Sequence, residues 1–281
     1  MIKGLLLYTK EDAKKNKWFI EHLMETAKKY GMDLVFSVFT DEFTATDKRD
    51  GTLYDFCINR TRYSCVNEFF EEKKIRCYNN FNTVQIANDK WETYRLCKEL
   101  EIPVMETWQV TDSLAMNLEY PVVIKSKNGH GGNEVFWINN QEELQKLGWE
   151  NESGYIAQSP VSTPGVDVRI YVLGDNIRIG VKRTSSKDFR SNFSLGGKVE
   201  LFTPTSEQLE MIEELQKVIA ADYAGFDFLL HNGSWVLNEI EDAVGARMLY
   251  SLVDFDIAEE WMQYICKDLQ ELYKCVEKMG K

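Results

Sequence analysis

Three carboxylates near the end of the chain have a spacing that suits a bound cation. Asp227 belongs to one apolar run, and Glu239 and Glu241 lie two apart in the next. Because side chains alternate along a strand, Glu239 and Glu241 share a face, and antiparallel pairing through the turn 231–234 would bring Asp227 alongside them. Magnesium prefers such oxygen ligands together with phosphate oxygens. A solvated strand face is the alternative, because the chain is acidic.

Lys125 and the turn that follows it suit the binding of a phosphate group. Lys125 ends the apolar run 122–125, and the turn 128–133 reads NGHGGN. Glycines let the backbone approach a phosphate closely, successive N–H groups form an anion-binding nest, and the lysine adds a positive charge. This is not a Walker A loop, in which the lysine follows the glycines and precedes a helix. A plain β-turn is the alternative.

A basic cluster lies between these two features. It begins with Lys182 and Arg183, continues with Arg190, Ser191 and Asn192, and closes with two glycines. In a chain with a formal net charge of −12, such a cluster requires an anionic partner or internal carboxylates. A network of surface salt bridges is the alternative.

Composition and charge exclude several classes of protein. The 281 residues are 44% hydrophobic and 28% charged, which is typical of a folded chain long enough for about two domains. The net charge of −12 argues against nucleic acid as a partner. The apolar opening at 5–8 is too short for a signal peptide or a membrane span. The six cysteines lack zinc-ligand spacing, so we expect no zinc site and a reducing, cytoplasmic location.

The first eighty residues are expected to form a parallel α/β domain. Apolar runs and helical spacing predict strands at 4–9, 33–39, 54–58 and 75–78, with helices over 12–30 and 63–73. Strands and helices that alternate at this length imply a parallel sheet covered by helices. A small domain with no chemistry of its own is one interpretation, because a fold alone names no function.

From residue 88 onward the alternation of strands and helices gives way to a series dominated by strands. These elements must position the lysines, arginines and carboxylates described above. Residues 88–89 can cap a helix that buries Trp91, Tyr94 and Leu100 and ends before 102–103. The last helix places Leu272 on its buried face. The predicted strands are 122–125, 134–138, 154–158, 168–173, 177–182, 226–230 and 235–240, and the further helices are 206–222 and 257–278.

The ordered set of motifs resembles the ATP-grasp superfamily, most closely its RimK-like glutamate-ligase branch. The matching segments are 75–79, 89–90, 102–104, 120–125 with the glycine turn, 158, 165–169, 189–192, and Asp227 followed by 239–241. No single motif is specific, whereas their order is. The resemblance implies an N-terminal parallel α/β domain over 1–82 and a two-lobed ATP-grasp fold. Its central lobe would cover 83–157 and its C-terminal lobe 158–281.

The resemblance also implies a cofactor, ATP with Mg²⁺ (for which Mn²⁺ can substitute), and roles for single residues. Lys90 and Lys125 look like the lysines that hold the ATP phosphates. The loop 129–133, with Gly131 and Gly132 among its glycine hinges, is expected to close over them as a lid, because an acyl phosphate must be kept from water. The other matched residues are Gln158 and Ser159 at the adenine, Asp167 at the ribose, Arg190, Ser191 and Asn192 as nucleotide contacts, Arg183 at the γ-phosphoryl group, and Asp227, Glu239 and Glu241 as metal ligands.

Two departures from the family pattern affect the substrate site. Glu241 stands where relatives usually have Asn, and its extra charge is expected to tighten metal binding. The loop 242–247 replaces a Pro-Gly pair, which puts the substrate in doubt because that loop borders the acceptor site in relatives. Arg247 suits a substrate carboxylate by its bidentate fork, or else pairs with Asp242 or Glu241.

Three functions remain open from sequence. The leading one is a carboxylate–amine ligase that forms an amide or peptide bond through an acyl phosphate. Its substrate would be an amino acid, a peptide or a carrier-bound acyl group. The second is an ATP-binding regulatory or scaffold protein that has lost the chemistry, and the third is an α/β module that binds another anion. No membrane partner is expected, and a homo-oligomer is left open.

Overall fold

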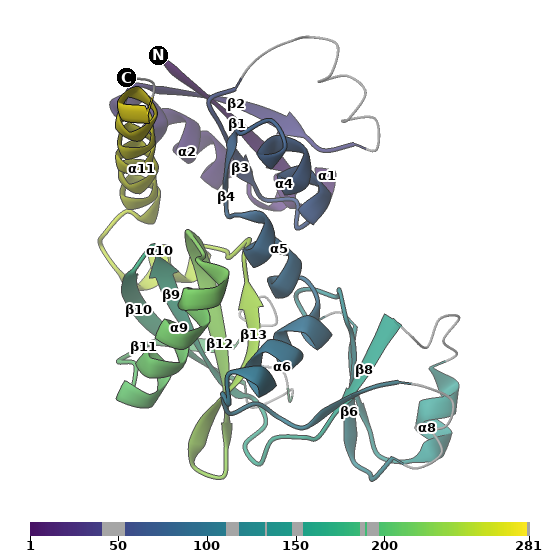
Figure 1. Ribbon diagram of the computed structural model, residues 1–281. Helices are drawn as coiled ribbons and strands as arrows, with labels where there is room; N and C mark the ends of the chain where they lie inside the picture. The colour runs from purple at the N-terminus through teal and green to yellow at the C-terminus, as the bar shows by residue number, and fades with distance from the viewer. Residues whose placement is uncertain are drawn as a thin grey trace.

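The computed structural model describes residues 1–40, 54–110, 118–132, 134–147, 154–185, 189 and 197–279. Three β-sheets, each with its own helices, make up this part of the chain (Figure 1). The mixed α/β fold class expected from the sequence is confirmed. No helix in these ranges is long and apolar enough to cross a membrane.

The first sheet is parallel, with strand order β2-β1-β3-β4. One correction concerns the helix predicted over 12–30, which is two helices separated at Asn16. The Asn16 side chain donates a 2.8 Å hydrogen bond to the Asp12 carbonyl, and such local bonds compete with the helical ladder. The elements are β1 (Ile2–Tyr8), α1 (Lys10–Lys15), α2 (Lys17–Lys29), β2 (Met32–Val38), β3 (Phe56–Asn59), α4 (Ser64–Glu71) and β4 (Arg76–Tyr78).

Two helices lead from this sheet to the second sheet. The first, α5 (Phe81–Ala87), was not predicted, whereas Asp89 caps α6 (Lys90–Glu99) as expected, accepting from the Trp91 N–H at 2.8 Å. The second sheet is antiparallel with order β5-β8-β6-β7. Its elements are β5 (Thr107–Gln109), β6 (Val122–Ser126), β7 (Val135–Ile138), α8 (Gln141–Lys146) and β8 (Tyr155–Gln158).

The third sheet is antiparallel with order β11-β10-β9-β12-β13, and α9 (Ser206–Ile219) packs against it. The helix predicted over 206–222 ends early, because Ala220 adopts a left-handed conformation with φ 48°. The strands are β9 (Val166–Leu173), β10 (Asn176–Thr184), β11 (Lys198–Phe202), β12 (Tyr223–His231) and β13 (Ser234–Glu241).

The end of the chain returns to the first sheet. After α10 (Arg247–Leu252), the long helix α11 (Ile257–Met279) lies beside α2 (Figure 1). Leu23 and Trp261 belong to one core, which the first sheet shares with the third. Leu272 corrects the prediction for this helix: its side chain is 42% exposed, and residues 271–274 are all exposed, so this turn of α11 lies outside the core.

Candidate functional site

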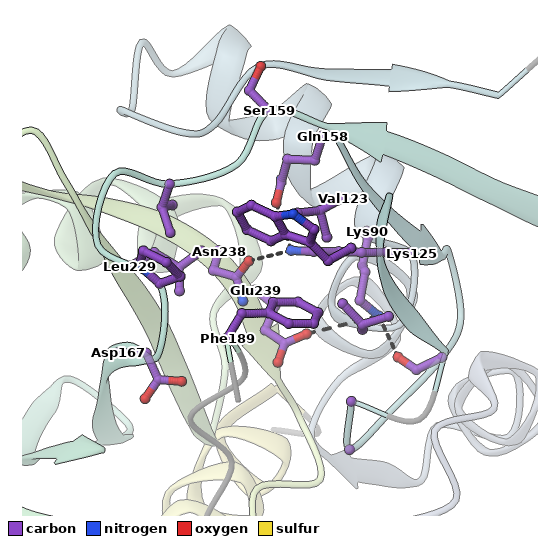
Figure 2. Close-up of a pocket in the computed structure, with 17 residues that line it drawn as sticks. Lys90, Val123, Lys125, Gln158, Ser159, Asp167, Phe189, Leu229, Asn238 and Glu239 are labelled. Carbon is purple, nitrogen blue, oxygen red and sulfur yellow. Dashed lines mark hydrogen bonds and ion pairs between the residues drawn. The ribbon is translucent and has the colours of Figure 1, made fainter. Parts of the chain in front are cut away.

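A pocket lies between the second and third sheets (Figure 2). Strands β6 and β8 contribute one wall, and β12 and β13 contribute the other. Its volume is about 100 Å³. The residues that were predicted from sequence and line it are Lys90, Lys125, Gly131, Gly132, Gln158, Ser159, Asp167 and Glu239.

Lys125 projects from the end of β6 into this pocket and is held by uncharged partners. Its Nζ donates to Gln158 Oε1 at 2.7 Å and to Asn238 Oδ1 at 2.8 Å. Burial lowers the pKa of Lys125 to about 8; Lys90 acts in the same direction and Glu239 against it. Two amide oxygens satisfy the ammonium group without neutralising its charge, so the group suits an anion that enters the pocket.

Lys90 joins the glycine turn to the carboxylates of the opposite wall. It is the first residue of α6, and its Nζ donates to the Gly129 carbonyl. The same Nζ lies 3.9 Å from Glu239 Oε2, as drawn in Figure 2. Lys90 and Lys125 therefore meet at one end of the pocket from two different elements.

The glycine turn needs its glycines for backbone conformation. Gly131 and Gly132 have φ 69° and 75°, a region that other residues rarely adopt. A Cβ at Gly129 would lie 2.9 Å from Glu134 Oε2, so this position is closed to side chains unless Glu134 moves. Asn133, the last residue of the predicted turn, lies outside the described residues.

The three predicted carboxylates converge on one face of the third sheet. Asp227 is the cross-strand partner of Glu239, as antiparallel pairing of β12 and β13 predicted. One ligand oxygen from each of Asp227, Glu239 and Glu241 lies within 4.8 Å of the others. Burial raises the pKa of Glu239, and the like charges of Asp227 and Glu241 add to the effect while Lys90 opposes it.

A β-bulge in β13 brings an unpredicted residue, Asn238, into the pocket. Asp227 pairs with Glu239 but the next residue, Phe228, pairs with Leu237, so Asn238 has no residue opposite it. Strict alternation would turn Asn238 away from the face that carries Glu239. The bulge re-aims its side chain, which accepts a hydrogen bond from Lys125. No local signal in the sequence marks this bulge.

Arg169 pairs with two of the three carboxylates and was not predicted from the sequence as a site residue. Its guanidinium donates to both oxygens of Asp227, at 2.7 and 2.6 Å, and lies 2.7 Å from Glu241 Oε1. Gly225 makes room for it, because a Cβ there would approach Arg169 Cδ to 3.2 Å. Period two along β9 offered a signal, since Asp167 and Arg169 share a face.

Arg183 occupies a similar ion pair one strand away. It donates to Asp167 Oδ1 and Oδ2, at 2.5 and 2.8 Å, and to Asp227 Oδ2 at 2.7 Å. Internal carboxylates thus compensate this part of the basic cluster. Burial alone would raise the pKa of Asp227, but Arg169 and Arg183 outweigh it and lower the pKa to about 2.

The three carboxylates fit a divalent cation, but they differ in how many acceptor positions they have left for it. An ionised carboxylate offers about four acceptor positions, and Asp227 already uses three for guanidinium hydrogen bonds. Glu239 has a looser partner, Lys90 at 3.9 Å. We therefore expect Glu239 and Glu241 to hold most of a Mg²⁺ ion, with Asp227 contributing its remaining position.

An apolar end of the pocket suits a flat ring. The rings of Trp137 and Phe189 have centroids 5.5 Å apart. Phe189, Val123 and Leu229 line the same pocket (Figure 2). Gln158 is near this end; it donates to Thr107 Oγ1 at 3.0 Å. None of these apolar side chains was predicted from the sequence as a site residue.

The remaining predicted residues lie elsewhere. Arg190, Ser191 and Asn192 fall outside the described residues. Arg247 begins α10 and is exposed, and it forms no ion pair with any residue that the structure describes. The alternative pairing of Arg247 with Asp242 or Glu241 is therefore not observed.

Comparisons with known proteins agree with this geometry. Residues 87–265 match the family model of a RimK-like ATP-grasp domain. An uncharacterized protein of Mycoplasma pneumoniae, an MG011 homolog, is 32% identical over 256 residues, 88% of this chain and 86% of that protein. A probable alpha-L-glutamate ligase of Haemophilus influenzae is 26% identical over 227 residues, 77% of this chain and 75% of that protein.

The fold is also that of a solved ligase. A D-alanine–D-alanine ligase from Bacillus anthracis, complexed with ATP, has a TM-score of 0.74 at 12% identity. The match covers 98% of this chain and 99% of that one. Because the family model spans most of the chain and includes both walls of the pocket, this chain belongs to the RimK-like ATP-grasp family.

Proposed function

We propose that the protein is an ADP-forming ligase that joins a carboxylate to an amine through an acyl phosphate. One observation carries the proposal: Lys90 and Lys125 on one wall of the pocket face a carboxylate cluster with Glu239 on the other. Positive charge for phosphate and oxygen ligands for a divalent cation thus meet in one place. ATP-grasp ligases as a family use ATP with a divalent metal.

The chemistry follows from these groups. A substrate carboxylate oxygen attacks the γ-phosphorus of ATP, the bond to the β-phosphate oxygen breaks, and ADP leaves. An amine nitrogen then attacks the acyl carbon, phosphate departs with the bonding electrons, and the nitrogen loses its proton. Magnesium, when bound, would neutralise phosphate charge. Lys90 and Lys125 would orient the phosphates, and the turn 128–132 would exclude water.

Substrate choice belongs to the region beyond Glu241. Arg247 is exposed at the start of α10, and its planar guanidinium suits a substrate carboxylate. Amino acids, peptides and carrier-bound acyl groups are the candidate substrates. The H. influenzae relative is named a glutamate ligase, which makes glutamate one amine to include.

The proposal is tested by ADP release. The chain with Mg-ATP would be screened against amino acids and peptides, with hydroxylamine present to trap acyl phosphates as hydroxamates. We expect ADP release and hydroxamate formation to depend on the same carboxylate. Release of ADP that no carboxylate or amine stimulates would contradict ligase activity.

A second function is favoured by one observation, the double pairing of Asp227 with Arg169 and Arg183. A carboxylate neutralised in this way would suit a regulatory protein that binds ATP without turning it over. In that case Mg-ATP would raise the melting temperature, yet no amine would stimulate ADP release. The same screen therefore separates the two functions.

A further inference from the structure

Strand β2 has one edge with no strand partner among the residues that the structure describes. It forms the end of the first sheet and pairs with β1 in a continuous register from Met32 to Val38 (Figure 1). It has no bulge and no proline, and Asp33 is its one charged residue. Proteins usually protect an open edge with bulges, prolines or charged residues, because unpaired backbone groups there can pair with another strand.

The hydrogen bonds show which backbone groups this edge offers. The Phe39 N–H donates to the Tyr8 carbonyl at 2.8 Å, and the Gly31 carbonyl accepts from the Ile2 N–H at 3.2 Å. Backbone groups alternate sides along a strand, so the odd-numbered residues of β2 face β1. The N–H and C=O groups of Leu34, Phe36 and Val38 therefore point outward.

A groove of about 770 Å³ lies along the same strand, between β2 and helices α1 and α2. Leu34, Phe36 and Val38 line it, with Ile20 and Met24 of α2 beside them. This volume is within the range of roughly 300–1,000 Å³ found for ligand sites. The groove thus combines an open backbone edge with apolar side chains.

The rim of the groove is basic, although the chain as a whole is acidic. Lys10, Lys14 and Lys17 line it, and Glu21 is the one acidic residue among the lining groups. Lys17 pairs weakly with Glu21 at 3.8 Å, whereas Lys10 and Lys14 form no ion pair within the described part of the chain. Against a net charge of −12, three lysines at one groove attract an anionic partner.

We propose that this groove docks an extended acidic peptide chain, which adds to the first sheet as a strand beside β2. The outward groups of Leu34, Phe36 and Val38 would bond its backbone, and the lysines would pair with its carboxylates. A second copy of this chain is a poorer occupant, because antiparallel pairing of two β2 strands would bring two sets of lysines together.

The proposal does not depend on ligase activity, yet the groove lies close to the candidate active site. On its other side α1 carries Asp12, which pairs with Arg62. Burial would lower the pKa of Arg62, but the carboxylates of Asp12, Asp242 and Glu241 raise it. One short helix thus separates the docking groove from the loop that follows the carboxylate cluster.

The test uses a fluorescent peptide of alternating Glu and Val with the full chain at low salt. Its controls are the same peptide with Lys for Glu, and one with Pro at every second position. We expect anisotropy to show binding of the first peptide alone. Residue-resolved hydrogen exchange should then show the amides of Leu34, Phe36 and Val38 slowed at least about tenfold, while Val35 and Ser37 stay unchanged.

Charge reversal on exposed helix positions separates docking from nonspecific attraction. Lys10→Glu with Lys14→Glu should weaken binding at least about tenfold, because both charges face the groove. The matched control, Lys28→Glu with Lys267→Glu, makes the same charge change on exposed helix positions outside the groove lining and should stay within about twofold.

Three results would overturn the proposal. Slow exchange of the outward amides of β2 in the free monomer would show that the edge is already covered. Protection that rises with protein concentration, together with a dimer on sizing, would assign the edge to a second copy. Equal weakening by both pairs of lysine variants would show general electrostatic attraction without a site.

Discussion

The two walls of the pocket handle charge in opposite ways. Lys125 of the second sheet is held by two amide oxygens, one from Gln158 on its own sheet and one from Asn238 on the opposite wall, and burial lowers its pKa. On the third sheet, Arg169 and Arg183 pair with three carboxylates and Glu239 adds a fourth, so negative charge is in excess. One wall therefore suits an anion and the other a divalent cation, which is the complement of a metal–nucleotide pair.

The difference also shows which side chains must act and which only hold others in place. Arg169 and Arg183 bind neighbours on their own sheet, and both are buried. Lys90 and Glu239 meet across the gap at 3.9 Å, longer than most pairs within a sheet. Charged groups that are separated by a longer distance across the pocket are free to bind a ligand instead of each other. The following predictions test this distinction.

The largest effect is expected at Glu239. Replacing Glu239 with Ala deletes the carboxylate with the loosest internal partner, and we expect ADP release to fall at least about a hundredfold. Glu200→Ala is the matched control, since Glu200 pairs with Lys182 at 3.5 Å on β11, outside the pocket lining. Full activity of the Glu239 variant across a magnesium titration would show that the cluster was misinterpreted.

Lys125→Ala should remove nucleotide binding. In a melting experiment, Mg-ATP at a hundred times its Kd stabilises a protein by about 2.7 kcal/mol. We expect that stabilisation to disappear, because Lys90, the other lysine on this wall, already pairs with Glu239 and does not replace the lost charge. Lys127→Ala, in which the lost group contacted Gln109 at 2.9 Å, should keep it. If Mg-ATP raises the melting temperature of Lys125→Ala as much as that of the native chain, Lys125 does not bind the ATP phosphates.

Glu241→Asn should give a graded loss. An amide oxygen can still bind Mg²⁺, but the carboxylate charge beside Arg169 is removed. We expect a measurable fraction of turnover and a higher magnesium requirement, seen as a shifted midpoint of ADP release against magnesium. If this variant is as inactive as Glu239→Ala at saturating magnesium, Glu241 does more than bind metal.

Nucleotide binding should take up protons at alkaline pH through Lys125. The free group has a pKa of about 8, lower than the roughly 10.4 of an exposed lysine, so it is mostly neutral at about pH 9. A bound phosphate favours the charged form, so part of a proton is absorbed. Calorimetry in two buffers with different ionisation enthalpies measures this uptake.

The same lysine predicts a pH dependence of stability. Because its folded pKa lies below its unfolded pKa, burying Lys125 is costly below pH 8, and the cost is lost as the pH rises toward about 10.4. Lys125→Met should therefore unfold at a higher denaturant concentration than the native chain near neutral pH, and the gain should shrink at high pH. Equal differences at both pH values would contradict the lowered pKa.

The smallest effect concerns the glycine turn. The pocket of about 100 Å³ is smaller than ordinary ligand sites of roughly 300–1,000 Å³, so we expect the turn 128–132 to open when ATP enters. We expect its amides to exchange faster without nucleotide and to be protected by a non-hydrolysable ATP analogue with magnesium. Equal protection in both states would contradict a lid.

Short elements with few periodic contacts escaped prediction. Helix α10 and strands β5 and β11 span too few residues to show a repeat, and α5 follows a strand with no apolar stripe to mark it. The single helix expected over 12–30 shows the same limit, because α1 buries no residue and therefore has no apolar stripe that would mark it as a separate helix.

The sequence by itself determined the α/β class, the order of most strands along the chain, and the chemical types of most groups in the pocket. Alternation along β13 was enough to place Glu239 and Glu241 on one face, since period two is local geometry. The family resemblance followed from the same ordered motifs.

Only the tertiary structure decided how these charges are compensated. Arg169 reaches Asp227 because β9 and β12 are neighbours, although the two residues lie 58 positions apart. Asn238 reaches Lys125 because a bulge breaks the alternation on which the sequence argument relied. Pairing between distant strands and a local break in register both depend on packing across the whole sheet. A single chain's pattern of residues does not specify either one.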